Sequence, residues 1–330
     1  MTAAAPGTRL PAAAPTELRA AVLAGGLAYE RDVSLRSGRR VAEALRHVGV
    51  DTRVLDADAE LLPALVADPV DALFIALHGA TGEDGALRSV LELAAIPFVG
   101  SRAGPCRIAW DKPSAKAAVR AAGHHTPEWV ALPHATFREL GAHAVLDLIV
   151  TRLGLPLMIK PAQGGSAMGV QLVGAAGDLP SAMVSCFAYA DAVLLEQFVA
   201  GSELAISVLD DGNGPQALPA VEIVPASGVF DYAARYTAGM TAYHAPARLE
   251  PGVADRAAEL ALTVHRILGL RDLSRTDAIV DPEGNVHFLE VNVSPGMTET
   301  SMLPMSVTAA GLDLGDTLRR LISAAAVSRR

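Results

Sequence analysis

The sequence HFLEVNVSPGMT (residues 287–298) reads as a β-strand that runs directly into a tight turn. Because strand side chains alternate between two faces, we expect Phe288, Glu290 and Asn292 on one face and Leu289 and Val291 on the other. A carboxylate and an amide on an apolar strand are costly to bury without a partner. A divalent cation is such a partner, since Mg²⁺ prefers oxygen ligands and is usually bound together with phosphates.

A second strand precedes this one and carries a further carboxylate. The sequence RTDAIVD (residues 275–281) is followed by the turn PEGN (residues 282–285), which is typical of a β-hairpin. The hairpin would return Glu290 to the neighbourhood of Asp277. We therefore predict a metal site formed by Asp277, Glu290 and Asn292. By spacing alone, a solvated strand face with two acidic side chains fits equally well.

The composition limits the possible classes of protein. The chain has 330 residues, of which 51% are hydrophobic, so it can form two or three packed units. Its formal net charge of −9 argues against nucleic-acid binding, and an anionic nucleotide would need local cations and a metal. Cys106 and Cys186 match neither a metal-binding spacing nor a disulfide framework. No apolar run is long enough for a membrane span, and we expect a cytoplasmic protein with a disordered leader over residues 1–19.

Residues 20–111 have the pattern of a doubly wound α/β unit. A buried strand ends at Gly25-Gly26, and a loop with Glu30, a helix and another strand follow. The glycine pair is too short for a dinucleotide-binding fingerprint, so we do not infer NAD. A third buried strand ends at His78. Functional loops gather at the carboxyl ends of such strands, which makes Glu30 and His78 candidate site residues, although a loop histidine considered alone is usually structural.

A second unit is predicted over residues 112–203, and it contains a candidate phosphate site. A strand with Lys160 near its end is followed by the glycine-rich loop AQGGSAMG (residues 162–169). The backbone N–H groups of such a loop can bind phosphates, and a lysine beside it is a natural phosphate partner. The loop is not a Walker loop, because neither a helix nor Gly-Lys-Ser/Thr follows. Without Lys160, a plain glycine-rich hairpin turn would be the better interpretation.

A third unit is predicted over residues 204–330. Just before it, at the end of the second unit, the strand at residues 193–199 and the polar segment with Glu203 could offer backbone groups to an adenine base and a carboxylate to a ribose. Considered alone, this segment is only a strand with a polar end. Farther along, a polar, glycine-containing segment is expected to form a mobile loop that carries Arg235 and Tyr236. The hairpin with the candidate metal residues and a last helix complete the chain.

Taken together, three segments resemble the D-alanine–D-alanine ligases of the ATP-grasp superfamily. They are GGLAYERDVSL (residues 25–35), ALHGATGEDG (residues 76–85) and EVNVSPGMT (residues 290–298). The resemblance covers nearly the whole chain beyond the leader. It implies an α/β (α+β) fold with three domains: an N-terminal doubly wound substrate-binding domain and two domains with antiparallel sheets that grip ATP.

The resemblance also implies a reaction and a set of ligands. ATP would phosphorylate the carboxylate of one D-alanine, and the amine of a second would attack the acyl phosphate, giving D-alanyl-D-alanine, ADP and phosphate for peptidoglycan precursors. Such a transfer depends on alignment and charge neutralisation. Asp277, Glu290 and Asn292 would hold Mg²⁺, as two ions that Mn²⁺ can replace, and the protein would be a homodimer. The residues implied in ATP binding are Lys112, Lys160, Gly165, Glu196, Phe198, Val199, Glu203 and Arg235.

For the amino-acid substrates, the resemblance implies two groups of residues. Glu30 would pair with the ammonium group of the first amino acid, with His78 nearby. Ser166 and Tyr236 would complete a hydrogen-bond chain with Glu30, and closure of Tyr236 over the site would exclude water.

The second group would act on the acyl centre and the second amino acid. Arg275 and the backbone N–H of Gly296 would form an oxyanion site. Ser301 and the backbone N–H of Met302 would bind the carboxylate of the second amino acid at the start of a helix.

Four positions depart from the common family pattern. The family usually has serine at Ala28 and at Ala167, lysine at Arg235 and threonine at Val293. Arg235 keeps the positive charge but presents a planar guanidinium group. None of these changes affects the metal residues, so we expect an active enzyme. They leave open an alternative, a related ligase of a resistance or antibiotic pathway that uses D-serine, D-lactate or another amino acid.

Overall fold

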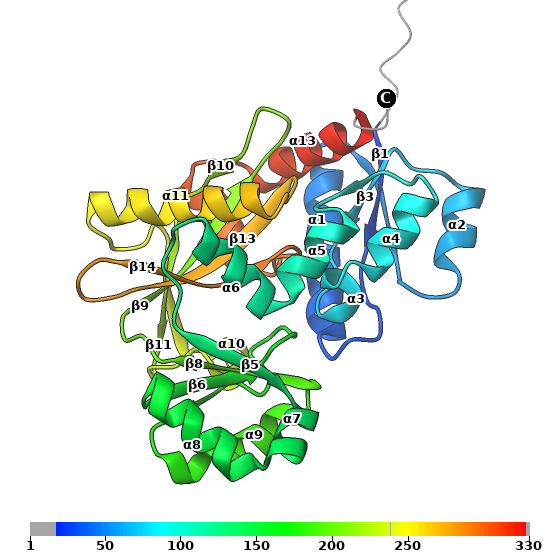
Figure 1. Ribbon diagram of the computed structural model, residues 1–330. Coiled ribbons are helices and arrows are strands. Elements are labelled where there is room, and N and C mark those ends of the chain that lie inside the picture. The colour runs from blue at the N-terminus through cyan, green and yellow to red at the C-terminus, as the bar shows by residue number, and fades with distance from the viewer. Residues whose placement is uncertain (1–17, 238, 328–330) are drawn as a thin grey trace, which may run out of the picture.

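The computed structural model describes residues 18–237 and 239–327, which contain one parallel and two antiparallel β-sheets flanked by helices (Figure 1). This mixed α/β architecture agrees with the predicted fold class. The first strand begins at Arg19, the last residue of the predicted leader. The leader residues 1–17 lie outside the described residues. Among the described helices, none has both the length and the apolar composition needed to cross a membrane.

The parallel sheet has four strands in the order β2-β1-β3-β4. Its strands are β1 (Arg19–Leu23), β2 (Asp51–Leu55), β3 (Ala72–Ile75) and β4 (Phe98–Val99). The helices that connect them are α1 (Arg31–His47), α2 (Leu61–Ala67), α3 (Ala80–Glu83) and α4 (Ala86–Leu93). β1 and β3 are adjacent and parallel, so the loop containing Glu30 and the segment containing His78 leave the sheet at the same edge.

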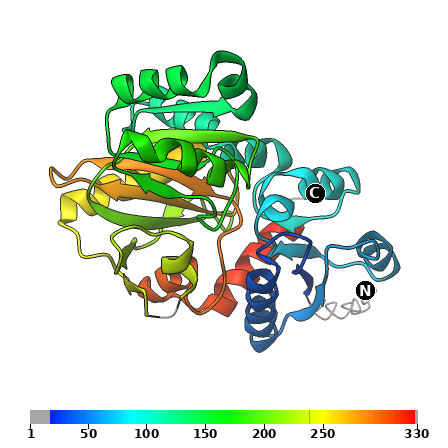
Figure 2. The same cartoon turned by 90° about the horizontal axis from the view of Figure 1, so that it is seen from below.

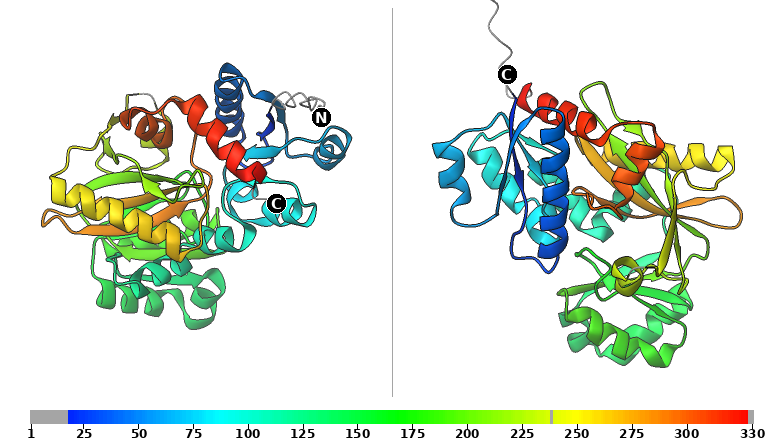
Figure 3. Two further views of the ribbon diagram at one scale, coloured as in Figure 1. Left: turned by 90° about the horizontal axis from the view of Figure 1, so that it is seen from above. Right: turned by 180° about the vertical axis from the view of Figure 1, so that it is seen from behind.

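The C-terminal helix packs on this first sheet, although it follows the third sheet in the chain. α13 (Leu314–Val327) contacts α1, β3 and β4, and Figure 3 shows it lying across α1. Its Leu318 and Ile322 share one buried apolar cluster with Val22 and Phe74. The last helix of the predicted unit of residues 204–330 therefore buries apolar side chains against the first unit, in a cluster that also includes Leu209 and Leu273 of the third unit.

The second sheet is antiparallel, with the strand order β5-β8-β6-β7. Its strands are β5 (Trp129–Pro133), β6 (Leu157–Pro161), β7 (Gln171–Val173) and β8 (Ala192–Gln197). The helices packed on one face are α7 (His134–Leu140), α8 (Ala142–Leu153) and α9 (Leu179–Phe187), with the short 3₁₀ helix η1 (Ala176–Asp178) before α9. Leucine, isoleucine and valine side chains of β6 and β8 fill the core under these helices, which leaves the other face of the sheet for a site.

The third sheet has six antiparallel strands in the order β12-β11-β9-β13-β14, with β10 paired to β9. Its strands are β9 (Ser202–Leu209), β10 (Gln216–Ala217), β11 (Val221–Pro225), β12 (Thr241–His244), β13 (Leu273–Val280) and β14 (Val286–Asn292). Its helices are α10 (Tyr232–Tyr236), α11 (Pro251–Ile267) and α12 (Met302–Ala309). Ser202 and Glu203 already belong to β9, so the predicted boundary after Glu203 falls inside a strand. The predicted mobile loop contains α10 and leads into β12.

Two consecutive helices connect the first sheet to the other two. They are α5 (Ala103–Trp110) and α6 (Lys112–Ala121). Asp111 caps α6, because its side chain accepts a hydrogen bond from the backbone N–H of Ser114. α6 packs on β14 of the third sheet and also contacts β5 of the second (Figure 2 shows the sheets from below). Residues of α6 can therefore reach the space between the two antiparallel sheets.

Candidate active site

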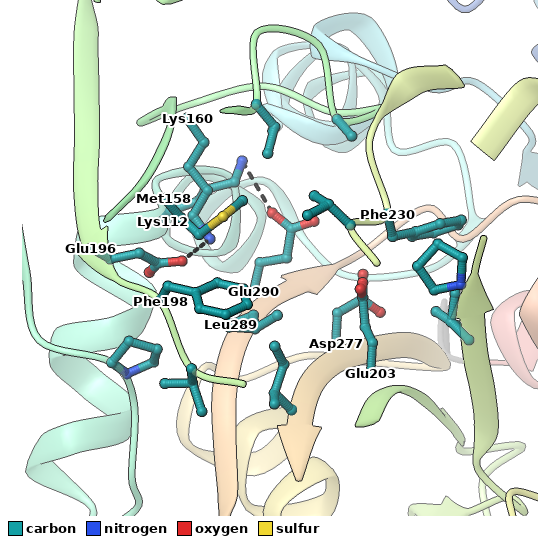
Figure 4. Close-up of a pocket in the computed structure, with 18 of the residues that line it drawn as sticks. Lys112, Met158, Lys160, Glu196, Phe198, Glu203, Phe230, Asp277, Leu289 and Glu290 are labelled. Carbon is teal, nitrogen blue, oxygen red and sulfur yellow. Dashed lines mark ion pairs between the residues drawn. The ribbon is translucent and has the colours of Figure 1, made fainter. Parts of the chain in front are cut away.

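The larger of two adjoining pockets lies between the two antiparallel sheets, and we call it the sheet pocket (Figure 4). All eight residues predicted to bind ATP line it: Lys112, Lys160, Gly165, Glu196, Phe198, Val199, Glu203 and Arg235. Met158, Phe198 and Leu289 form apolar walls. In Figure 4, Glu196 lies on one side of Phe198 and Leu289, and Asp277 and Glu203 lie on the other. Apolar walls flanked by charged groups suit a flat base that carries a phosphate chain.

A β-bulge between β13 and β14 sets which side chains enter the sheet pocket. Asp277 pairs with Glu290, but the next residue, Ala278, pairs with Phe288, so Leu289 has no partner. Leu289 and Glu290 both line the pocket, whereas Phe288 is buried in the core under the sheet. The prediction that Phe288 shares a face with Glu290 is therefore wrong. Strict alternation fails because the bulge adds one residue to the strand.

Two lysines provide positive charge at the polar end of the sheet pocket. Lys112 Nζ lies 3.2 Å from Glu290 Oε2 and donates to the carbonyl of Gly164 at 2.7 Å. Lys160 Nζ lies 2.5 Å from Glu196 Oε1. Burial opposes ionisation of Glu290, but the charges of Lys112 and Lys160 lower its pKa to about 2. This carboxylate is therefore ionised and available to a cation.

The glycine-rich loop has an unusual backbone and approaches the first unit closely. Ser166 and Ala167 both adopt left-handed φ angles, 58° and 55°, which non-glycine residues seldom do. A Cβ atom on Gly165 would lie 3.3 Å from Glu30 Oε1. The loop therefore lies against Glu30, and a side chain at position 165 would crowd that carboxylate.

The predicted metal residues come together, although other groups engage all of them. Arg275 donates from Nε and Nη2 to the two carboxylate oxygens of Asp277, both at 2.7 Å. Asn292 Oδ1 accepts the N–H of Ser294 at 2.7 Å. The described residues contain no cluster of three or more His, Cys, Asp or Glu suited to a metal. Two carboxylates and an amide still form an all-oxygen donor set, which fits Mg²⁺ when phosphates and water complete its shell.

The second pocket, which we call the loop pocket, lies where loops of the first and third units meet. The six residues that line it and were predicted for catalysis or for the amino-acid substrates are His78, Ser166, Arg275, Gly296, Ser301 and Met302. Asn292, the third metal residue, lines it as well. Glu30 does not line this pocket; it is buried, and its Oε2 lies 2.5 Å from where a Cβ atom on Gly79 would lie. The backbone of Tyr236 ends α10, but its side chain lies outside the described part of the structure.

His78 is fully engaged by protein atoms. Its Nδ1 lies 3.1 Å from the carbonyl oxygen of Ser294 and must donate to it, so Nε2 accepts from Ser37 Oγ at 3.0 Å. Burial lowers the pKa of His78 to about 4. A neutral histidine of this kind positions the loop of Ser294 and does not carry charge to a substrate.

The loop pocket also contains an acid to which the sequence analysis gave no role. Glu83 Oε1 accepts the backbone N–H of Gly79 at 2.9 Å, and burial raises the pKa of Glu83 to about 7. Glu30 lies nearby, and its Oε1 has no hydrogen-bond partner among the described residues. The two carboxyl groups form an acidic end of the pocket that suits an ammonium group. The motif Gly82-Glu83-Asp84-Gly85 was the signal that could have indicated Glu83.

Another part of the loop pocket suits an anion. Ser301 Oγ contacts the backbone N and the Oγ1 of Thr298 at 3.0 and 2.9 Å, and Met302 follows as the first residue of α12. A Cβ atom on Gly296 would lie 2.6 Å from Ser301 Oγ, so a side chain at position 296 would displace that hydroxyl. Helix N-termini and free N–H groups favour carboxylates.

Two residues line both pockets and mark the junction between them. These are Phe230 and Arg235, whose guanidinium carbon lies 4.6 Å from the centre of the Phe230 ring. Asp277 and Glu290 face the sheet pocket, while Asn292 faces the loop pocket. The candidate metal residues therefore stand at the passage from one pocket to the other.

Comparisons with known proteins show the family to which the chain belongs. Residues 55–101 match the family model for the D-ala D-ala ligase N-terminus, and residues 118–323 match that for the C-terminus. A D-alanine–D-alanine ligase of Anaeromyxobacter dehalogenans (strain 2CP-C) is 41% identical over 312 residues, 94% of this chain and 98% of the relative.

Two solved structures are also similar. The VanG D-Ala:D-Ser ligase of Enterococcus faecalis has a TM-score of 0.80 and 28% identity, over 94% of this chain and 100% of that one. The D-alanine–D-alanine ligase of Bacillus anthracis complexed with ATP has a TM-score of 0.79 and 27% identity, over 94% and 98% of the two chains. The fold is that of an ATP-grasp ligase. The chain belongs to the D-alanine–D-alanine ligase family.

Proposed function

We propose that the protein joins two D-alanine molecules in an ATP-dependent reaction that releases ADP and phosphate. The observation that carries this proposal is the junction of the two pockets. Arg235 and Phe230 line both pockets, and the candidate metal residues line one pocket or the other at this junction. A phosphoryl group bound in the sheet pocket would reach a carboxylate bound in the loop pocket at this place. A solved D-alanine–D-alanine ligase complexed with ATP shares the fold, and a D-alanine–D-alanine ligase is 41% identical in sequence.

ATP would lie in the sheet pocket with its base between the apolar walls. Lys112, Lys160 and the N–H groups of the Gly164–Gly169 loop would neutralise and align its phosphates. Asp277, Glu290 and Asn292 would hold Mg²⁺, and Mn²⁺ would be able to replace it. When bound, Mg²⁺ supplies charge neutralisation of the phosphate oxygens and fixes their geometry. The residues of this chain align the γ-phosphate with the loop pocket.

The first D-alanine would place its ammonium group at Glu30 and its carboxylate at the junction. One carboxylate oxygen attacks the γ-phosphorus, and the bond from that phosphorus to the β–γ bridging oxygen breaks, so ADP leaves and an acyl phosphate forms. Ser166 and Tyr236 would close a hydrogen-bond chain with Glu30. Closure of the segment around α10 would exclude water, which would otherwise hydrolyse the acyl phosphate.

The second D-alanine would bind its carboxylate at Ser301 and the N–H of Met302. Its deprotonated amine attacks the acyl carbon, and Arg275 and the N–H of Gly296 would stabilise the negative oxygen that develops. Collapse of this tetrahedral species expels phosphate, which carries away one oxygen of the first carboxylate. The product is D-alanyl-D-alanine, and the amine proton passes to the surroundings.

A coupled assay of ADP release tests this proposal. With ATP, Mg²⁺ and D-alanine we expect turnover, and mass spectrometry should find the D-alanine dipeptide. L-Alanine should give no turnover. Full turnover with L-alanine and none with D-alanine would contradict the proposal.

A second candidate is a ligase that accepts D-serine or D-lactate in place of the second D-alanine. The similarity to a D-Ala:D-Ser ligase structure favours keeping it. Mass spectrometry of products formed from equimolar D-alanine, D-serine and D-lactate separates the two. We also propose that the reaction supplies peptidoglycan precursors in the cytoplasm, where ATP is available. We further propose that the protein is a homodimer, which analytical ultracentrifugation would test.

A further inference from the structure

Behind the sheet pocket lies a buried cluster of three charged side chains. Glu196 on β8 contacts Lys160 through Oε1 at 2.5 Å and Lys116 through Oε2 at 2.8 Å. The side chains of Lys116 and Glu196 are 0% and 2% exposed. Lys160 and Glu196 line the sheet pocket, but Lys116 lines neither of the two described pockets. No step of the proposed reaction uses Lys116.

The fold holds Lys116 in place from the far side of Glu196. Lys116 lies on α6, and its Nζ is 5.2 Å from the ring centre of Trp129 on β5. Trp129 is the direct strand partner of Glu196. The contact from Lys116 to Glu196 Oε2 is an ion pair without hydrogen-bond geometry. Lys116 therefore acts on Glu196 through its charge, from a position fixed by helix packing and an aromatic face.

The charges of the cluster do not cancel. One carboxylate stands between two ammonium groups, so one net positive charge remains. Without Lys116, Lys160 and Glu196 would form a pair with no net charge. Lys160 would then be the only counter-ion of Glu196 within this cluster. Breaking a buried pair to present a lysine elsewhere is strongly unfavourable, because it leaves the other charge unpaired. With Lys116 present, Glu196 keeps a partner when Lys160 turns toward an anion.

We propose that Lys116 is a positioning residue of the nucleotide site: by pairing with Glu196 from behind the pocket, it leaves the charge of Lys160 for the nucleotide phosphates. The inference rests on the proposed binding of ATP in the sheet pocket. It predicts that Lys116 affects the binding of phosphates and not that of the base. A purely structural lysine would affect both alike.

Calorimetric titration of the full chain with ATP, and competition by adenosine, test the inference. Lys116→Met should weaken ATP binding by about 10-fold, as expected for the loss of one charge interaction near a phosphate. Adenosine affinity should stay within twofold of the wild type, and Lys116→Arg should retain most of the ATP affinity. Equal weakening of ATP and adenosine, or no change in ATP affinity, would overturn the inference.

A double-mutant cycle covers the possibility that Lys116→Met does not fold. In the background of Glu196→Gln, where the carboxylate charge is absent, adding Lys116→Met should change ATP affinity by less than twofold. A further 10-fold loss in that background would overturn the inference. If the wild type binds ATP, this further loss would contradict only the role of Lys116 and not the proposed function. Failure of the wild type to bind ATP would instead contradict the proposed function itself.

Discussion

Asp277 on β13 lies directly opposite Glu290 on β14, and both carboxylates line the sheet pocket. The two residues differ in their other partners. Asp277 is buried and accepts hydrogen bonds from Nε and Nη2 of Arg275. Glu290 is partly exposed and pairs with Lys112. Loss of the negative charge should therefore reduce catalysis at both positions. It should reduce stability mainly at Asp277.

Glu290→Gln and Asp277→Asn should each lower ADP release at least about 100-fold, because both remove a proposed metal ligand. Asp277→Asn should also destabilise the fold by roughly 3 kcal/mol, since Arg275 loses its buried partner. Denaturant unfolding and a titration of activity with Mg²⁺ measure the two effects. Retained full turnover in either variant would remove that residue from the metal site.

Glycine residues at two helical positions give a matched test of packing. A Cβ on Gly82 in α3 would lie 2.1 Å from the carbonyl oxygen of Leu77, whereas a Cβ on Gly104 in α5 has no atom within 4 Å. Gly82→Ala should destabilise the protein by about 2 kcal/mol or more. Gly104→Ala should be neutral or stabilise it by up to about 1 kcal/mol. Equal unfolding free energies for the two variants would contradict the packing around α3.

His265 should make stability depend on pH away from the active site. It is buried on α11, its Nδ1 contacts Ser274 Oγ at 2.8 Å, and burial lowers its pKa to about 4. The folded state keeps His265 neutral, while the unfolded state binds a proton below about pH 6.5. Stability is therefore complete above pH 6.5 and is lost as the pH falls toward 4.

The measurement is chemical unfolding of the wild type and His265→Asn at pH 7.5 and 4.5. Between these values, the wild type should lose roughly 2 kcal/mol more than the variant, which has no imidazole to titrate. Parallel losses in the two proteins would show that His265 does not contribute to acid sensitivity.

Residues at the junction of the pockets should act on both substrates. Phe230 lines both pockets and stacks on Arg235, whereas Met158 lines the sheet pocket and not the loop pocket. Phe230→Ala should raise KM for ATP and for D-alanine, each by about 5- to 10-fold, through lost packing and a loosened Arg235. Met158→Ala, the control, should raise KM for ATP alone. A change confined to ATP in Phe230→Ala would contradict the shared junction.

Local sequence patterns predicted the hairpin and its acidic residues well. The turn at residues 282–285 and the flanking apolar residues are local signals, and the structure pairs Asp277 with Glu290 as expected. The pattern could not show the bulge at Leu289, because a period of two contains no mark of an inserted residue. That bulge sends Phe288 to the core and gives the pocket Leu289, which the sequence analysis did not assign to the site.

Contacts between distant segments were beyond the sequence pattern. The packing of α13 on α1 brings together residues from opposite ends of the chain. The pattern of an amphipathic helix shows which face is buried but not which sheet that face covers. Lys116 lies four positions after Lys112, but only the fold shows that it faces Glu196. The position of Lys160 near the pocket could be predicted, because it stands beside a recognisable glycine-rich loop, whereas Lys112 was implied by the family resemblance.

The most direct test of the central claim follows an oxygen atom from D-alanine to phosphate. The protein is incubated with ATP, Mg²⁺ and D-alanine labelled with ¹⁸O in its carboxylate, and the released inorganic phosphate is analysed by mass spectrometry. Ligation through an acyl phosphate predicts one ¹⁸O atom in each phosphate released. Phosphate without ¹⁸O, formed in step with the dipeptide, would contradict the account.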